Sequence, residues 1–105
     1  VHGNFNISQI FFTNDQVSGV LDWDQAGYGD RAIDLVGLWY SVVGTPEIAD
    51  IVMQQLLAVS TKPAIYIYAV HKILAQLAWH INKVHGDVDE QTLQAQTAIK
   101  LLQAL

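Results

Sequence analysis

The sequence contains no cysteine, which excludes a disulfide framework and a thiolate metal site and fits a cytoplasmic protein. Basic residues are also scarce, because 5 Lys and Arg stand against 10 Asp and Glu and give a net charge of −5. This balance excludes the electrostatic attraction that drives non-specific nucleic-acid binding, and it excludes polybasic attachment to a membrane. We therefore expect a cytoplasmic protein with no nucleic-acid partner and no membrane partner.

Long hydrophobic runs are missing as well. Charged residues such as Asp34, Asp50, Lys72 and Lys83 interrupt the apolar stretches before they reach the length of a membrane span. No basic segment followed by an apolar segment indicates a signal peptide. Because the chain opens with Val1 where a translated product would open with Met, we expect a cut N-terminus. What is abundant is apolar sequence, 51% of 105 residues, which is enough for one folded domain.

Composition divides the chain into two parts. Residues 1–30 are rich in Gly, Asn, Asp and aromatic residues, whereas residues 31–105 are rich in Ala, Leu, Ile, Val and Gln. In the first part, residues 10–12 and 17–21 are β-branched or aromatic runs separated by turn-forming side chains, which predicts a β-hairpin. The expected fold class is α+β, predominantly α, with a short hairpin packed on a helical subdomain.

The second part predicts four helices. Asp30 is placed to cap a helix over 31–40 that ends near Gly44, and Thr45 with Pro46 starts a second helix. A third helix begins at Pro63 and closes at His85-Gly86, and Asp89 caps the last. We expect the following apolar residues to face the core: Ile48, Ile51, Val52, Leu56 and Val59, then Ile67, Val70, Ile73, Leu74, Leu77 and Ile81, and finally Leu93, Ile99, Leu101 and Leu102.

The polar side chains just before the first strand and just after the second strand form the candidate site. The loop His2-Gly3-Asn4 leads through Gln9 into the first strand, and Asp22 follows the second strand. Adjacent antiparallel strands place Asn4, Gln9 and Asp22 at the same end of the pair. Convergent oxygen ligands of this kind suit Mg²⁺ and a phosphate.

These residues resemble a known family. An H-G-D motif with Asn five residues later, a strand pair, D-W and G-D-P-x-x-D-L-A are typical of the aminoglycoside and choline phosphotransferases, which share the protein-kinase fold. Here the corresponding segments are His2-Gly3-Asn4, Gln9, Asp22-Trp23 and residues 29–35. The resemblance covers residues 1–35, and its most specific stretch is residues 20–35.

The resemblance implies roles for individual residues. Asn4 occupies the position of the base that accepts the substrate hydroxyl's proton, beside His2. Gln9 and Asp22 occupy the positions that bind Mg²⁺ in the family. The family's cofactors are Mg²⁺ and ATP. Asp34 occupies the position that braces the catalytic loop, and we hypothesise that its carboxylate accepts backbone N–H bonds there. Helices like those of residues 31–105 complete the C-terminal lobe and help to form the cleft for the acceptor.

The sequence departs from the family at Asn4, at Gln9 and at Arg31, which replaces the usual Pro. A neutral amide is no general base, a change that typically costs about 10²–10⁴ in rate. Gln9 is one methylene longer than Asn, and Mg²⁺ tolerates little distortion of its octahedral geometry. The resemblance also places the nucleotide-binding lobe before His2, so we expect a single truncated domain without that lobe, which binds neither Mg²⁺ nor ATP by itself.

Several residues have competing interpretations. Asp22 and Asp24 share a face if the segment is extended and so form a possible metal pair, but Asp24 is favoured as a solvated or turn-forming acid. Asp30 is favoured as a helix cap and Asp34 as a structural residue. His85-Gly86-Asp87 repeats the H-G-D letters but is favoured as a pair of helix caps. His71 and His80 lie nine residues apart, on different helix faces, and predict no metal site.

The expected function is the C-terminal lobe of a phosphotransferase that moves the ATP γ-phosphate to a hydroxyl of a small molecule, inactive as this chain. The alternative is a non-catalytic binding or oligomerisation module. A lobe that lacks its partner surface should expose apolar side chains, so we expect a homo-oligomer or association with the missing N-terminal lobe. A plain helical scaffold is expected only if the hairpin and loop do not form.

Overall fold

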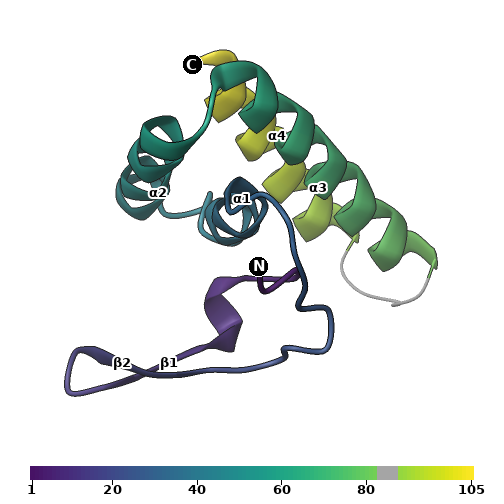
Figure 1. The fold of residues 1–105 in the computed structure, drawn as a ribbon. Helices are drawn as coiled ribbons and strands as arrows, with labels where there is room; N and C mark the ends of the chain where they lie inside the picture. The colour runs from purple at the N-terminus through teal and green to yellow at the C-terminus, as the bar shows by residue number, and fades with distance from the viewer. Residues whose placement is uncertain (83–87) are drawn as a thin grey trace.

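The computed structural model describes residues 1–82 and 88–105, and this part of the chain is predominantly helical with one small antiparallel hairpin (Figure 1). Its elements in chain order are the 3₁₀ helix η1 (Ile7–Gln9), strands β1 (Ile10–Thr13) and β2 (Gln16–Val20), and helices α1 (Ala32–Ser41), α2 (Pro46–Val59), α3 (Lys62–Asn82) and α4 (Val88–Gln103). The expected α+β class with a helical majority is confirmed. None of the described helices combines the length and the apolar character that crossing a bilayer requires.

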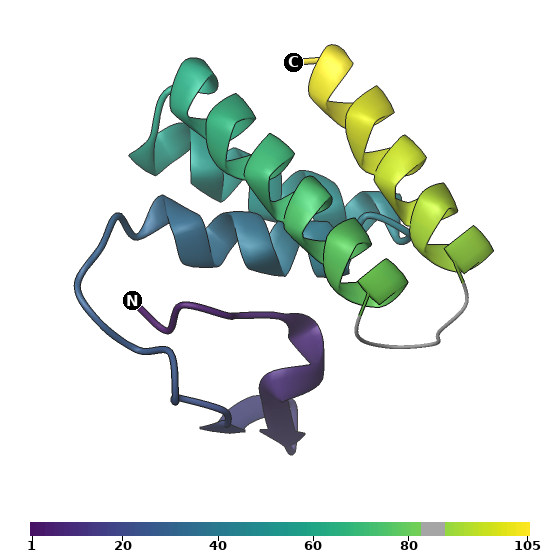
Figure 2. The ribbon, with the colours of Figure 1, turned by 90° about the vertical axis from the view of Figure 1, so that its right-hand side faces the viewer.

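The predicted hairpin is present, and its turn explains its register. Asn14 and Asp15 both have positive φ, 51° and 63°, as a tight two-residue hairpin turn requires. The register shifts between Phe11, which pairs with Gly19, and Phe12, which pairs with Val17. Figures 1 and 2 show the hairpin projecting from the helices, so the segments that flank the strands carry most of the attachment to the helical part.

The core lies between the four described helices, with α1 at its centre. α1 packs against α2 and α3, and α3 packs against α4 (Figure 2). The largest fully buried side chains are Trp39, Leu56, Ile65, Val36 and Val43. Large apolar side chains removed from water contribute about 1.5–3 kcal/mol each, so this cluster is the main stabilising feature of the helical part.

The face of α3 that reaches the core differs from the expected one. The buried residues are Ile65, Ala69 and Ile73, spaced by four residues. Of the residues expected on the buried face, only Ile73 is fully buried, and the following are exposed: Ile67, Val70, Leu74 and Ile81. The prediction was wrong because α3 is apolar on more than one face, and the small residue Ala69 is among those buried.

Similar corrections apply to the neighbouring helices. In α2, Val52 and Leu56 are buried as expected, but Ile48 and Ile51 are exposed. In α4, Leu102 is buried as expected, and the other two buried positions belong to alanines. The exposed residues there are Leu93 and Ile99. Alanine carries little apolar surface, so it contributes weakly to the hydrophobic periodicity from which the buried face was predicted. Its small side chain nevertheless fits well between closely packed helices.

The helix ends lie near their expected positions. Asp30 Oδ1 accepts the backbone N–H of Ala32 at 2.9 Å, so Asp30 caps the start of α1. α1 ends at Ser41, earlier than Gly44, and α3 begins one residue before Pro63. Thr45 precedes α2 without a side-chain capping bond. Asp89 lies inside the first turn of α4, because that helix already begins at Val88. The predicted cap at His85-Gly86-Asp87 lies outside the described residues.

A glycine on α1 lets the N-terminal loop lie directly on the helix. A Cβ at Gly37 would collide with the backbone carbonyl oxygen of Phe5, so no other residue fits this position without a shift of the loop. One turn further along, Ser41 Oγ accepts the backbone N–H of Ile7 at 3.0 Å. α1 therefore supports the loop through backbone contact rather than through large side chains.

We expect Gly37→Ala to destabilise the protein although alanine favours a helix by about 1 kcal/mol. The added methyl group must displace Phe5, and overpacking of this kind typically costs about 1–3 kcal/mol. Thermal unfolding followed by circular dichroism measures the change. Gly44→Ala is the matched control, because a Cβ at Gly44 meets no atom within 4 Å. Equal melting temperatures for the two variants would contradict the close contact.

Candidate functional site at the N-terminal loop

His2 connects the N-terminal loop to the end of the hairpin. Its side chain is buried, with Nε2 2.7 Å from the backbone oxygen of Leu21, and Nδ1 accepts the backbone N–H of Asn4 at 3.2 Å. This pattern requires the proton on Nε2, which then donates to Leu21. The imidazole also lies 4.7 Å from the Trp23 ring and 5.4 Å from the Phe5 ring, centroid to centroid. His2 therefore fixes the distance between the loop and the segment that carries Asp22.

Asp34 holds the same loop from the side of α1. Its Oδ2 accepts the backbone N–H of His2 at 2.7 Å, and its Oδ1 accepts that of Gly3 at 3.0 Å. Gly3 has φ +94°, and a Cβ there would collide with the backbone oxygen of Gln25. The two carboxylate bonds and the left-handed glycine together direct Asn4 into the space between the loop and α3.

Gln9 takes part in a capping box at the start of η1. Asn6 Oδ1 accepts the backbone N–H of Ser8 at 3.0 Å, and Gln9 Oε1 accepts the backbone N–H of Asn6 at 3.2 Å. The other end of the Gln9 amide, Nε2, donates to Asp22 Oδ2 at 3.3 Å. Gln9 is buried and close to Asp22, but the group that it presents to the carboxylate is the amide nitrogen.

Asp22 is exposed and adopts φ 68°, which turns the chain sharply after β2. A hydrogen bond and charge repulsion from Asp24, together with desolvation, raise the pKa of the Asp22 carboxyl, while the Gln9 hydrogen bond lowers it to a smaller extent. The two carboxyl groups form a pair that a cation would stabilise.

Asp30 lies apart from these groups, at the start of α1. Hydrogen bonds from the backbone N–H of Ala32 and from the Tyr68 hydroxyl, the latter at 2.9 Å, lower the pKa of its carboxyl group. The same contact raises the pKa of Tyr68. Asp30 therefore links the connection after the hairpin to α3.

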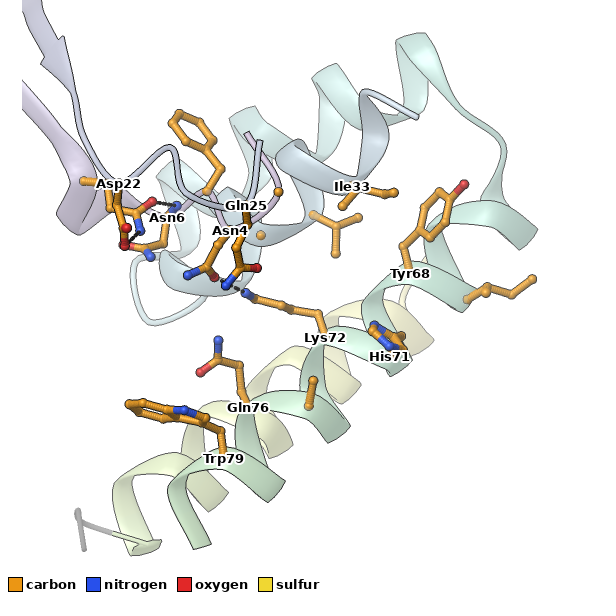
Figure 3. Close-up of a pocket in the computed structure, with 17 residues that line it drawn as sticks. Asn4, Asn6, Asp22, Gln25, Ile33, Tyr68, His71, Lys72, Gln76 and Trp79 are labelled. Carbon is orange, nitrogen blue, oxygen red and sulfur yellow. Dashed lines mark hydrogen bonds between the residues drawn. The ribbon is translucent and has the colours of Figure 1, made fainter. Parts of the chain in front are cut away.

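A pocket of about 1000 Å³ lies between the loop and α3. From the loop side it is lined by Asn4, Asn6, Gln9, Asp22 and Gln25, and α3 contributes Tyr68, His71, Lys72, Gln76 and Trp79 (Figure 3). Asn4, Gln9 and Asp22 thus border one space, together with residues from a distant part of the chain. The volume is at the upper end of the range for small-molecule sites.

Lys72 is the residue of this pocket that sequence reasoning missed. Figure 3 shows its side chain extending from α3 towards Asn4, and its Nζ lies 3.5 Å from Asn4 Oδ1. A single lysine within an apolar helical pattern carries no signal of its own. Only the packing of α3 across the loop reveals its position.

The positions of His71 and His80 on α3 differ in what they face. His71 lines the pocket and His80 does not, in agreement with their expected positions on different helix faces. Within residues 1–82 and 88–105, no three His, Cys, Asp or Glu side chains are grouped closely enough to hold a metal ion.

The N-terminal loop is thus braced on the helical subdomain and faces an open pocket that polar side chains line. A comparison with protein families then matches residues 1–68 to the phosphotransferase enzyme family, APH. The match includes the loop, the hairpin, α1, α2 and the first residues of α3, so the chain belongs to this family. No curated protein and no solved structure matches the chain.

We expect Asp34→Ala to loosen the loop around His2, because two backbone N–H groups lose their acceptor. Limited proteolysis and hydrogen exchange of residues 2–4 measure the effect, and both rates should rise. The matched control is Asp50→Ala, which removes an exposed carboxylate from α2. If residues 2–4 stay as protected as in the control, the bracing role of Asp34 is refuted.

Proposed function

We propose that this chain is the C-terminal-lobe part of a phosphotransferase that transfers the γ-phosphate of ATP to a hydroxyl of a small molecule, and that it does not catalyse this transfer in its present sequence. The observation that supports the proposal best is the chain of contacts from Asp34 through His2 to Leu21. It brings the loop residue Asn4 and the hairpin residue Asp22 to the border of one pocket.

Asn4 accounts for the first part of the proposed loss of activity. In the transfer, the acceptor oxygen forms a bond to the γ-phosphorus, the bond from that phosphorus to the bridging oxygen breaks, and the hydroxyl proton must leave. The Asn4 amide can hold a hydroxyl by hydrogen bonding but has no basic site for its proton. Loss of a general base typically lowers the rate by about 10²–10⁴. Because phosphoryl transfer depends mainly on positioning and charge, this change alone leaves some activity.

The residues present fit Mg²⁺ only in part. Asp22 is exposed, and its pKa is raised by the hydrogen bond and the nearby charge of Asp24; carboxylate oxygens of this kind are ligands that a hard cation prefers. Gln9 does not fit, because its oxygen accepts the Asn6 N–H and its nitrogen faces Asp22. Rotating the amide would turn the nitrogen towards the Asn6 N–H and cost that hydrogen bond. We therefore derive no step through the metal.

Replacing Gln9 by Asn tests this account. The shorter side chain cannot reach Asn6 in the same way, so its oxygen becomes free to face Asp22. We expect Gln9→Asn to bind Mg²⁺ at least about tenfold more tightly than the unchanged chain, as measured by NMR titration of the residue 22 amide. The combination with Asn4→Asp should restore phosphate transfer when the nucleotide-binding lobe is supplied.

The control is Gln9→Asn combined with Asp22→Asn, which retains the shorter side chain but removes the carboxylate, and it should lose the added affinity. Equal Mg²⁺ affinity for the unchanged chain and the Gln9→Asn variant would refute the metal part of the proposal. A double variant that transfers no phosphate with the lobe present would refute the assignment of the loop.

The alternative function is a binding or assembly module, and exposed apolar residues favour it. Phe11, Phe12 and Val17 on the hairpin are each at least half exposed, as are Ile67 and Leu74 on α3. Such side chains drive association when they form continuous patches. We expect a dimer or higher oligomer in multi-angle light scattering. A monodisperse monomer at all concentrations would contradict the assembly function.

A further inference from the structure

The Lys72 ammonium has an unusual environment for a lysine. It is half-buried in the pocket, and burial lowers its pKa. Among residues 1–82 and 88–105 it makes one hydrogen bond, to Asn4 Oδ1, which at 3.5 Å is at the limit of what counts as a bond. An ammonium group has three donors, so this single long bond leaves donors that a bound ligand could use.

No carboxylate of residues 1–82 or 88–105 pairs with the Lys72 ammonium. Asp22 is the one carboxylate among the residues that line the pocket, and its Oδ2 accepts from Gln9 Nε2 rather than from Lys72. A cation that is partly removed from water without a partner is unfavourable, and a bound anion would remove that penalty.

The groups around Lys72 are also suited to donate to an anion. In the same described ranges, the side-chain amides of Gln25 and Gln76 make no hydrogen bond, and Asn4 uses only its oxygen. Each of the three amides therefore offers an N–H₂ group to the pocket. Trp79, which is 53% exposed, lies at the rim and offers an apolar ring face beside these donors (Figure 3).

We propose that the pocket binds an acceptor carrying an anionic oxygen group, a phosphate or a carboxylate, with Lys72 as its anchor and the amides of Asn4, Gln25 and Gln76 as additional donors. The inference rests on the proposed function, because it takes this pocket as the acceptor side of a phosphotransferase site. It goes further by assigning the charge of the acceptor. A polycationic acceptor would meet the unpaired ammonium and is disfavoured.

Binding of four sugars that differ in charge tests the proposal in the absence of Mg²⁺ and nucleotide. The probes are glucose, glucosamine, gluconate and glucose 6-phosphate, titrated into the full chain and followed by NMR of the Lys72 side chain and the Trp79 indole. We expect the two anions to bind and to raise the pKa of Lys72, because an opposite charge favours the ammonium form. Glucose and glucosamine should bind at least about tenfold more weakly.

Lys72→Met retains the apolar stem and removes the charge, and it should weaken binding of both anions about tenfold or more. Lys100→Met is the matched control, because Lys100 is exposed on α4 and away from the pocket. Equal binding of all four sugars, or equal losses in the two variants, would overturn the proposal.

A further arm with ATP distinguishes the two sources of a bound phosphate. If ATP without Mg²⁺ shifts the Lys72 signals and neither anionic sugar does, the anion belongs to the nucleotide, and the acceptor assignment is overturned. Because these measurements require neither the metal nor phosphate transfer, their failure is distinct from a failure of the Gln9 and Asn4 variants.

Discussion

The site depends on one carboxylate. Asp34 binds two consecutive backbone N–H groups of the loop from a position on α1, whose other face is buried in the helical core. The orientation of the loop is thereby tied to the most stable part of the protein. His2 then transmits this orientation to the end of the hairpin through a second backbone contact, at Leu21. Without Asp34, residues 2 and 3 would lose their two hydrogen bonds to α1.

Local chemistry made part of this arrangement predictable from the sequence. The hairpin was predictable because Asn14 and Asp15 tolerate the left-handed backbone that a short turn needs. The starts of α1 and α2 were predictable for similarly local reasons, from Asp30, which accepts the N–H of Ala32, and from Pro46. The buried faces of α3 and α4 were not, because Ala69, Ala95 and Ala98 are buried while several larger apolar neighbours remain exposed. A prediction from periodicity favours the most hydrophobic side chains, whereas small side chains are buried at these positions.

The residues of the site also differ in whether they could be predicted from the sequence. Asn4, Gln9 and Asp22 could be grouped from the sequence because a tight hairpin brings its two ends together. Lys72 could not, since its position opposite Asn4 follows from how α3 crosses the loop, 68 residues further along the chain. The chemistry of the pocket is therefore set jointly by a local motif and by long-range packing. Only the first leaves a recognisable signature in the sequence.

Gln9 illustrates how one side chain can be committed to shape rather than to reactivity. By filling the capping box, it closes the 3₁₀ turn that leads into β1, and the same atoms are then withheld from any ligand. A shorter residue such as Asn would lose the hydrogen bond to Asn6, and its side-chain oxygen would become available to a ligand. The Gln9 amide can either close the turn or coordinate a metal ion, but it cannot do both. A sequence change that favours one of these uses therefore works against the other.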